Sequence, residues 1–116
     1  MITFPKDTPR LGWTRHIKNK MVFYGISGAT ILRIFRSAHR REEGIAPGTS
    51  AAMRTVKHNR TGKTAGPKET ELWVMYKTTP TKRVTMISAW RYPGKTKVGE
   101  RPLIPDDVLE ELEKMS

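Results

Sequence analysis

The sequence predicts one α+β domain, in which two N-terminal helices pack on a small, mostly antiparallel sheet of three to four strands. Three observations predict it. Apolar residues recur at helical spacing early in the chain, apolar and polar residues roughly alternate in its middle, and 116 residues fit a single domain. We expect this basic domain over residues 1–94, and a basic linker with a short acidic helix over residues 95–116.

After an irregular lead-in over residues 1–12, two helices are expected. The first helix is expected over residues 14–24. It is predicted by apolar residues spaced by four, four and three positions, which are Trp13, Ile17, Met21 and Tyr24. Gly25 suits the left-handed position that ends a helix. Ser27 is a favourable N-cap for a second helix over residues 28–38.

Strands are expected from alternation and from β-branched and aromatic residues. The segments 51–58, 71–77 and 83–92 have apolar positions for a core, and a basic loop without core-forming residues separates the first two of them at 59–68. The segment 83–92 is apolar on both faces in its middle, so we place it centrally in the sheet. The expected strands are a short one near Arg40, then 51–58, 71–77 and 83–92. Val108, Leu112 and Met115 form the apolar stripe of the final helix, over 106–115.

Charge indicates the class of partner. The net charge is +11, and residues 1–104 carry 21 basic and six acidic side chains. A positive field of this size attracts polyanions, so we expect a nucleic acid, RNA in particular, as the partner. A basic domain that binds an acidic protein, or that is merely well solvated, is the alternative.

Several function classes are not expected. Cysteine is absent, and the three histidines do not have the spacing of metal ligands, so no metal site or cofactor is expected. The sequence contains neither a phosphate-binding glycine loop nor a serine-hydrolase motif. The first residues lack the apolar core of a signal peptide, and no apolar run is long enough to span a membrane. We therefore expect a cytoplasmic protein without membrane contact.

Basic, hydroxyl and aromatic side chains remain, and these suffice for metal-free RNA cleavage. That reaction needs a base, an acid, and cations that stabilise the phosphorane. Arg91, Tyr92 and His16 are the candidate catalytic residues, with Tyr92 or His16 moving protons. The candidate nucleic-acid-binding residues are Arg15, Lys18, Lys20, Arg40, Arg41, Arg54, Lys57, Arg60 and Lys63. The alternatives are a solvated basic helix face and, for Arg40 and Arg41, local ion pairs with Glu42 and Glu43.

The first helix and its cap resemble a known family. The pattern H-x-x-x-(K/R)-M-x-x-(R/Y)-G-I-S is matched by His16, Lys20, Met21, Tyr24, Gly25, Ile26 and Ser27. It is similar to the opening of small domains related to RelE/ParE/BrnT-type toxins of toxin–antitoxin systems. The resemblance covers about residues 13–92. The opening motif of the BrnT type is absent, and the C-terminal segment 95–116 has no counterpart in the family.

The resemblance implies a fold, an activity and partners. It implies two helices on a twisted antiparallel sheet, a metal-independent endoribonuclease acting on messenger RNA, and an acidic antitoxin-like partner. Arg91 and Tyr92 resemble the late Arg and Tyr that some members use. A non-catalytic RNA- or DNA-binding module, for example one associated with the ribosome, and a protein-interaction domain that binds an acidic partner are the alternatives.

Overall fold

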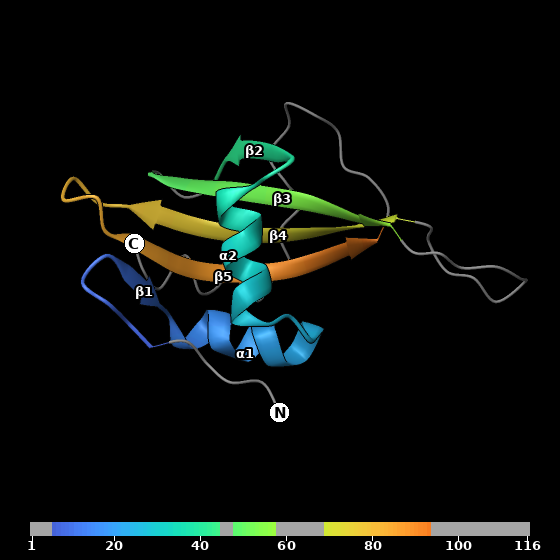
Figure 1. The fold of residues 1–116 in the computed structure, drawn as a ribbon, viewed down its shortest axis with the longest axis horizontal. Helices are drawn as coiled ribbons and strands as arrows, with labels where there is room; N and C mark the ends of the chain where they lie inside the picture. Colours follow the sequence, from blue (N-terminus) through green and yellow to red (C-terminus); the bar gives the residue numbers. More distant parts are fainter. Residues whose placement is uncertain (1–5, 45–47, 58–68, 94–116) are drawn as a thin grey trace, which may run out of the picture.

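The computed structural model describes residues 6–44, 48–57 and 69–93 (Figure 1). In these residues the chain forms β1 (Leu11–Trp13), α1 (Arg15–Tyr24), α2 (Gly28–Arg36), β2 (Arg40–Glu43), β3 (Thr49–Lys57), β4 (Glu69–Thr78) and β5 (Val84–Pro93). The α+β class, both helices and the four expected strands are confirmed. The linker and the acidic helix expected over 95–116 lie outside the described residues.

The strands form one mixed sheet in the order β1-β5-β4-β3-β2 (Figure 1). Strands β2 to β5 pair antiparallel with their neighbours. Strand β1 pairs parallel with β5, with Leu11 opposite Val84 and Trp13 opposite Met86. The prediction of three to four strands was therefore wrong by one strand, because the supposed irregular lead-in contains β1. A strand of three residues is too short to show alternation, and its partner lies far along the chain.

The helix ends follow the local chemistry of the sequence. The Thr14 hydroxyl accepts a hydrogen bond from the Ile17 N–H at 3.1 Å and donates one to the Ile87 carbonyl at 2.7 Å. It thus caps α1 and ties the start of that helix to β5. Gly25 ends α1 in the expected left-handed conformation, with φ of 67°. Ser27 then caps α2 by accepting from the Thr30 N–H at 3.2 Å.

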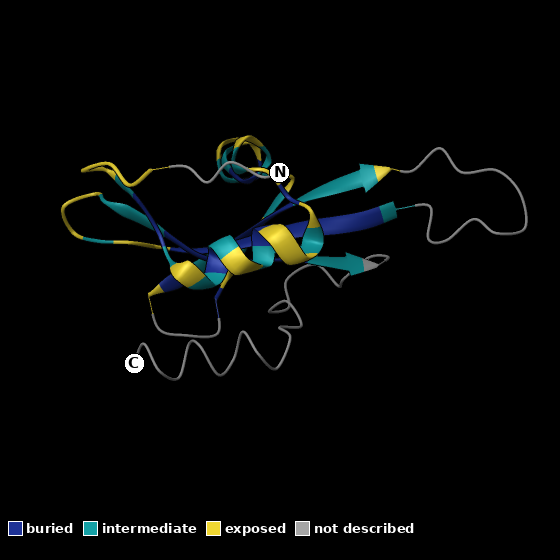
Figure 2. Cartoon of the chain, turned by 90° about the horizontal axis from the view of Figure 1, so that it is seen from below, coloured by how far each residue is buried: buried dark blue, intermediate teal, exposed yellow. Residues whose placement is uncertain are grey.

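Helix α2 crosses one face of the sheet, whereas α1 follows the edge of β5 beyond the end of β1 (Figures 1 and 2). We call the face covered by α2 the helix side. On this side the middle strands carry three small side chains in register, namely Ala52, Val74 and Ala89. Their small size allows α2 to approach the sheet closely. They share one buried cluster with Ile31 and Ile34 of α2, and with Ile17 and Met21 of α1.

The opposite side of the sheet carries a second buried cluster. Its members are Ala51, Met53, Trp73, Met75, Ile87 and Trp90, each at most 3% exposed. Trp73 and Trp90 lie opposite each other on β4 and β5, and their rings are stacked with centroids 6.1 Å apart. We call this side the tryptophan side. Both sides of the middle strands are therefore buried, as the apolar pattern of 83–92 predicts.

Candidate nucleic-acid interface

The two sides of the sheet differ in their balance of charge. Successive residues of a strand point to opposite sides, so each charged residue can be placed by its buried neighbours. Arg41, Arg54 and Arg91 lie on the helix side, in register with the buried Ala52 and Leu72. The carboxylates of β4 and one from β2 lie on the tryptophan side: Glu42, Glu69 and Glu71. Glu43, opposite Ser50, adds one carboxylate to the helix side, and the tryptophan side also carries Arg40 and Lys57. In the described strands the helix side thus has three arginines against one carboxylate.

Three arginines of the helix side hold the helices in place. Arg91 Nη2 donates to the carbonyl of Tyr24, the last residue of α1, at 3.1 Å. Arg41 donates to the carbonyl of Phe35, and Arg54 to that of Ser37, at the C-terminal end of α2. The last carbonyls of a helix have no partner within the helix and carry partial negative charge. These guanidinium groups therefore satisfy them, a role that the sequence analysis did not predict.

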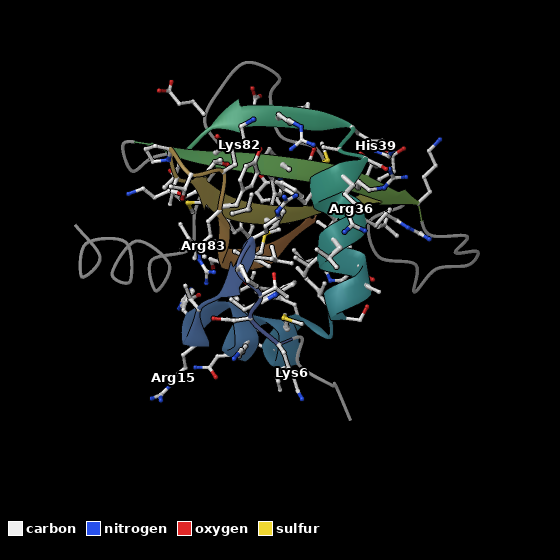
Figure 3. The ribbon with its side chains drawn as sticks, turned by 60° about the vertical axis from the view of Figure 1, so that its left-hand side comes forward. Lys6, Arg15, Arg36, His39, Lys82 and Arg83 are labelled. Carbon is white, nitrogen blue, oxygen red and sulfur yellow. The ribbon has the colours of Figure 1, made fainter. Side chains whose placement is uncertain are left out.

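Several basic side chains lie near the C-terminal end of α2. Arg33 and Arg36 are exposed in the last turn of the helix, and the exposed His39 follows it. Figure 3 shows Arg36 and His39 together at this end of α2, while Arg15 and Lys6 lie beside α1 at the other end. We call Arg33, Arg36, His39, Arg41 and Arg54 the α2-end cluster. Arg33, Arg36 and His39 are not among the predicted binding residues.

Arg40, a predicted nucleic-acid contact, lies on the tryptophan side. Its guanidinium is 2.8 Å from a Glu42 carboxylate oxygen and 3.7 Å from one of Glu71, and it lies over the Trp73 ring at 5.2 Å. The side chain of Arg40 is only 13% exposed and that of Glu71 only 2%. Trp73 also donates its indole N–H to Glu71 at 3.0 Å. This geometry favours the local ion pairing that was the alternative for Arg40, and we do not include Arg40 in the interface.

The remaining basic candidates of the middle region lie elsewhere. Lys57 ends β3 opposite Glu69, so it belongs to the tryptophan side. Arg60 and Lys63, expected in the basic loop, lie outside the described residues. Of the predicted nucleic-acid contacts in β3, only Arg54 therefore lies on the helix side.

The three candidate catalytic residues do not face a common space. Arg91 and Tyr92 are consecutive in β5, so they point to opposite sides of the sheet, Arg91 towards Tyr24 and Tyr92 towards the tryptophan cluster. His16 lies on α1, with Nε2 2.9 Å from the Ser88 hydroxyl. Arg91 and Tyr92 thus extend from opposite sides of one strand. The described geometry therefore does not assemble the acid, base and cation that cleavage requires.

Helix α1 presents its own basic and apolar groups. Arg15 is exposed and Lys18 half-buried. The Lys20 ammonium lies over the rings of Phe23 and Tyr24, at 5.2 and 5.8 Å from their centroids, and burial lowers the Lys20 pKa. Phe23 is 75% exposed. Sequence reasoning missed Phe23, although its position off the apolar stripe of α1 is the signal that could have placed it at the surface.

Within the described ranges, no three His, Asp or Glu side chains are grouped so that they could hold a metal ion. None of the helices in the same ranges has the length and apolar character needed to cross a bilayer. No family model, curated protein or solved structure matches the chain.

Proposed function

We propose that this domain binds RNA through its helix side. The observation that carries the proposal is the excess of arginines on the helix side, where the described strands contribute three arginines and one carboxylate, Glu43. Arg41, Arg54 and Arg91 lie on the side covered by α2, whereas Glu42, Glu69 and Glu71 lie on the other. Phosphate contacts supply most of the affinity of sequence-independent binding. The resemblance of α1 and its cap to toxin domains that act on messenger RNA supports RNA over DNA.

The α2-end cluster is the proposed centre of the interface. A guanidinium group has five N–H donors, so Arg41 and Arg54 can bind a phosphate while each keeps its bond to a helix carbonyl. Arg33 and Arg36 project from the last turn of α2 and extend the positive surface outwards. The anchored arginines provide cations in defined positions, and the exposed ones can adjust to the RNA backbone.

Salt dependence tests this proposal directly. If RNA binding neutralises about five phosphates, the logarithm of the association constant should fall with the logarithm of salt concentration with a slope of roughly −3 to −4, from about −0.7 per phosphate. Fluorescence anisotropy with a labelled single-stranded RNA at 50 to 300 mM salt would give the slope. A slope near zero, or no binding in low salt, would rule out an electrostatic RNA interface.

Cleavage is a separate question, and the geometry favours binding without cleavage. Because Arg91 and Tyr92 lie on opposite sides of β5, we expect labelled RNA to remain intact when incubated with the protein in EDTA. Gel electrophoresis would check for fragments ending in a 2′,3′-cyclic phosphate. Such fragments from wild-type protein, absent with a folded His16→Ala variant, would restore the metal-independent endoribonuclease hypothesis with a site on α1.

A further inference from the structure

An exposed aromatic residue lies at the C-terminal end of α1. Among the described residues, the exposed large hydrophobic side chains are Val22 and Phe23, at 59% and 75% exposure. A single exposed apolar residue is common on protein surfaces and needs no functional explanation. What surrounds Phe23 therefore decides whether it forms a binding site.

Phe23 is part of an ordered group of side chains. Its ring meets that of Tyr24 edge to face, with centroids 4.8 Å apart and an interplanar angle of 85°. The Lys20 ammonium lies 5.2 Å from the Phe23 centroid and 5.8 Å from that of Tyr24. Cation–π attraction and the edge-to-face contact both restrict the ring, while most of its surface stays open to solvent. A restricted, open aromatic ring next to a cation suits a flat ligand that carries negative charge.

This group is joined to the positive row of the helix side. Arg91 donates to the Tyr24 carbonyl at 3.1 Å and lies in register with Leu72 of β4 and Arg54 of β3. Neighbouring strands are about 4.8 Å apart, so roughly 10 Å separate the backbones at Arg91 and Arg54. Positive groups thus follow one another from Lys20 across the sheet to the α2-end cluster, with an aromatic ring at the beginning of the row.

We propose that an unpaired base of an RNA strand stacks on Phe23, and that the phosphates of the same strand lie along Lys20 and Arg91. Aromatic side chains bind single-stranded RNA by stacking on its bases. In a duplex the bases are paired and stacked on one another, so they are not accessible to such a side chain. The domain should therefore prefer single-stranded RNA to a duplex of equal length. This inference rests on the proposed RNA binding and adds the class of RNA that is recognised.

The exposed ring could instead contact an apolar protein surface, such as a second copy of the chain. The adjacent cation argues against that occupant, because burying the Lys20 ammonium under an apolar surface would remove it from water. A nucleotide supplies both the flat base and the anionic phosphate. The test below distinguishes these occupants.

The expected result is that Phe23→Ala weakens binding of single-stranded RNA by about 5- to 150-fold, the range measured for loss of one base–aromatic stack. Affinity for a duplex of the same length should change by less than about twofold, and the salt slope should stay the same because no charge is removed. Fluorescence anisotropy with both RNAs gives these values. Phe23→Trp should retain binding, and Val22→Ala, an exposed apolar change on the same helix, is the matched control.

Each other outcome has a defined meaning. Equal losses for single-stranded and duplex RNA, or no loss for either while wild-type protein binds, would overturn the stacking inference and leave the proposed function intact. Absence of wild-type RNA binding would overturn both. A wild-type dimer that becomes monomeric on Phe23→Ala in analytical ultracentrifugation would assign the surface to a second copy of the chain and reject the stacking site. Because Phe23 is 75% exposed, Phe23→Ala should leave the fold intact, which circular dichroism checks.

Discussion

Replacing Arg40 with alanine is expected to lower the free energy of unfolding by about 3–5 kcal/mol, the usual cost of removing one partner of a buried ion pair. Glu71, with its side chain 2% exposed, would keep the indole bond from Trp73 but lose its arginine, and Glu42 would lose the same partner. A buried charge without its partner retains the full desolvation penalty. Urea unfolding followed by tryptophan fluorescence measures the loss.

Two comparisons make the Arg40 experiment specific. Arg15→Ala removes an equal charge from an exposed position of α1 and should change stability by less than about 0.5 kcal/mol. A double variant, Arg40→Met with Glu71→Met, should lose less stability than Arg40→Ala, because it removes the most buried charge, that of Glu71, together with its arginine. If Arg40→Ala keeps wild-type stability but weakens RNA binding, Arg40 belongs to the interface after all.

The double variant Arg33→Gln/Arg36→Gln is expected to have the largest effect on RNA binding without loss of the fold. At 0.1 M salt, each phosphate contact contributes about 0.7 logarithmic units to the association constant, so losing two should weaken binding about 25-fold. The salt slope should become less steep by about 1.4. Glutamine keeps the helix propensity, and each arginine stabilises the end of α2 by only about 0.3–1 kcal/mol. Anisotropy titrations at several salt concentrations give both quantities.

A matched control removes the same amount of charge elsewhere. Lys77 and Lys82 are exposed at the end of β4 and in the turn that leads to β5, away from the α2-end cluster. Lys77→Gln/Lys82→Gln should therefore change RNA affinity by only a few-fold through the overall field. If both double variants lose affinity equally, binding depends on net charge alone, and the helix side is not a defined interface.

The helices and the three longest strands were predictable because each repeats its pattern. In α1 the stripe from Ile17 to Tyr24 covers about two helical turns, and residues 70–78 of β4 all pair with β5. Trp13, expected at the start of the helical stripe, lies in β1 instead. Strand β1 has only three residues and is defined by pairing with Val84–Met86. Such a distant partner leaves no local signal, so the sheet was predicted one strand too small.

The candidate site was less predictable, for reasons that differ among residues. Alternation in a strand already implies that Arg91 and Tyr92 face opposite sides, so this part could have been inferred from the sequence. The same rule places Arg40 and Glu42 on one side, where they pair. The bonds of Arg41, Arg54 and Arg91 to helix carbonyls depend on how α1 and α2 lie against the sheet, which the sequence pattern does not specify.

The short outer strands bear on how the molecule behaves at high concentration. The sheet ends in β1, with three residues, and in β2, whose four residues are Arg, Arg, Glu and Glu. An outer strand offers unpaired backbone groups to which another chain can add, and brevity and charge are the usual protection against fibre formation. A foreign strand added to β2 would have to cover charges of both signs. The ionic residues of β2 thus also help to keep copies of the domain from joining their sheets.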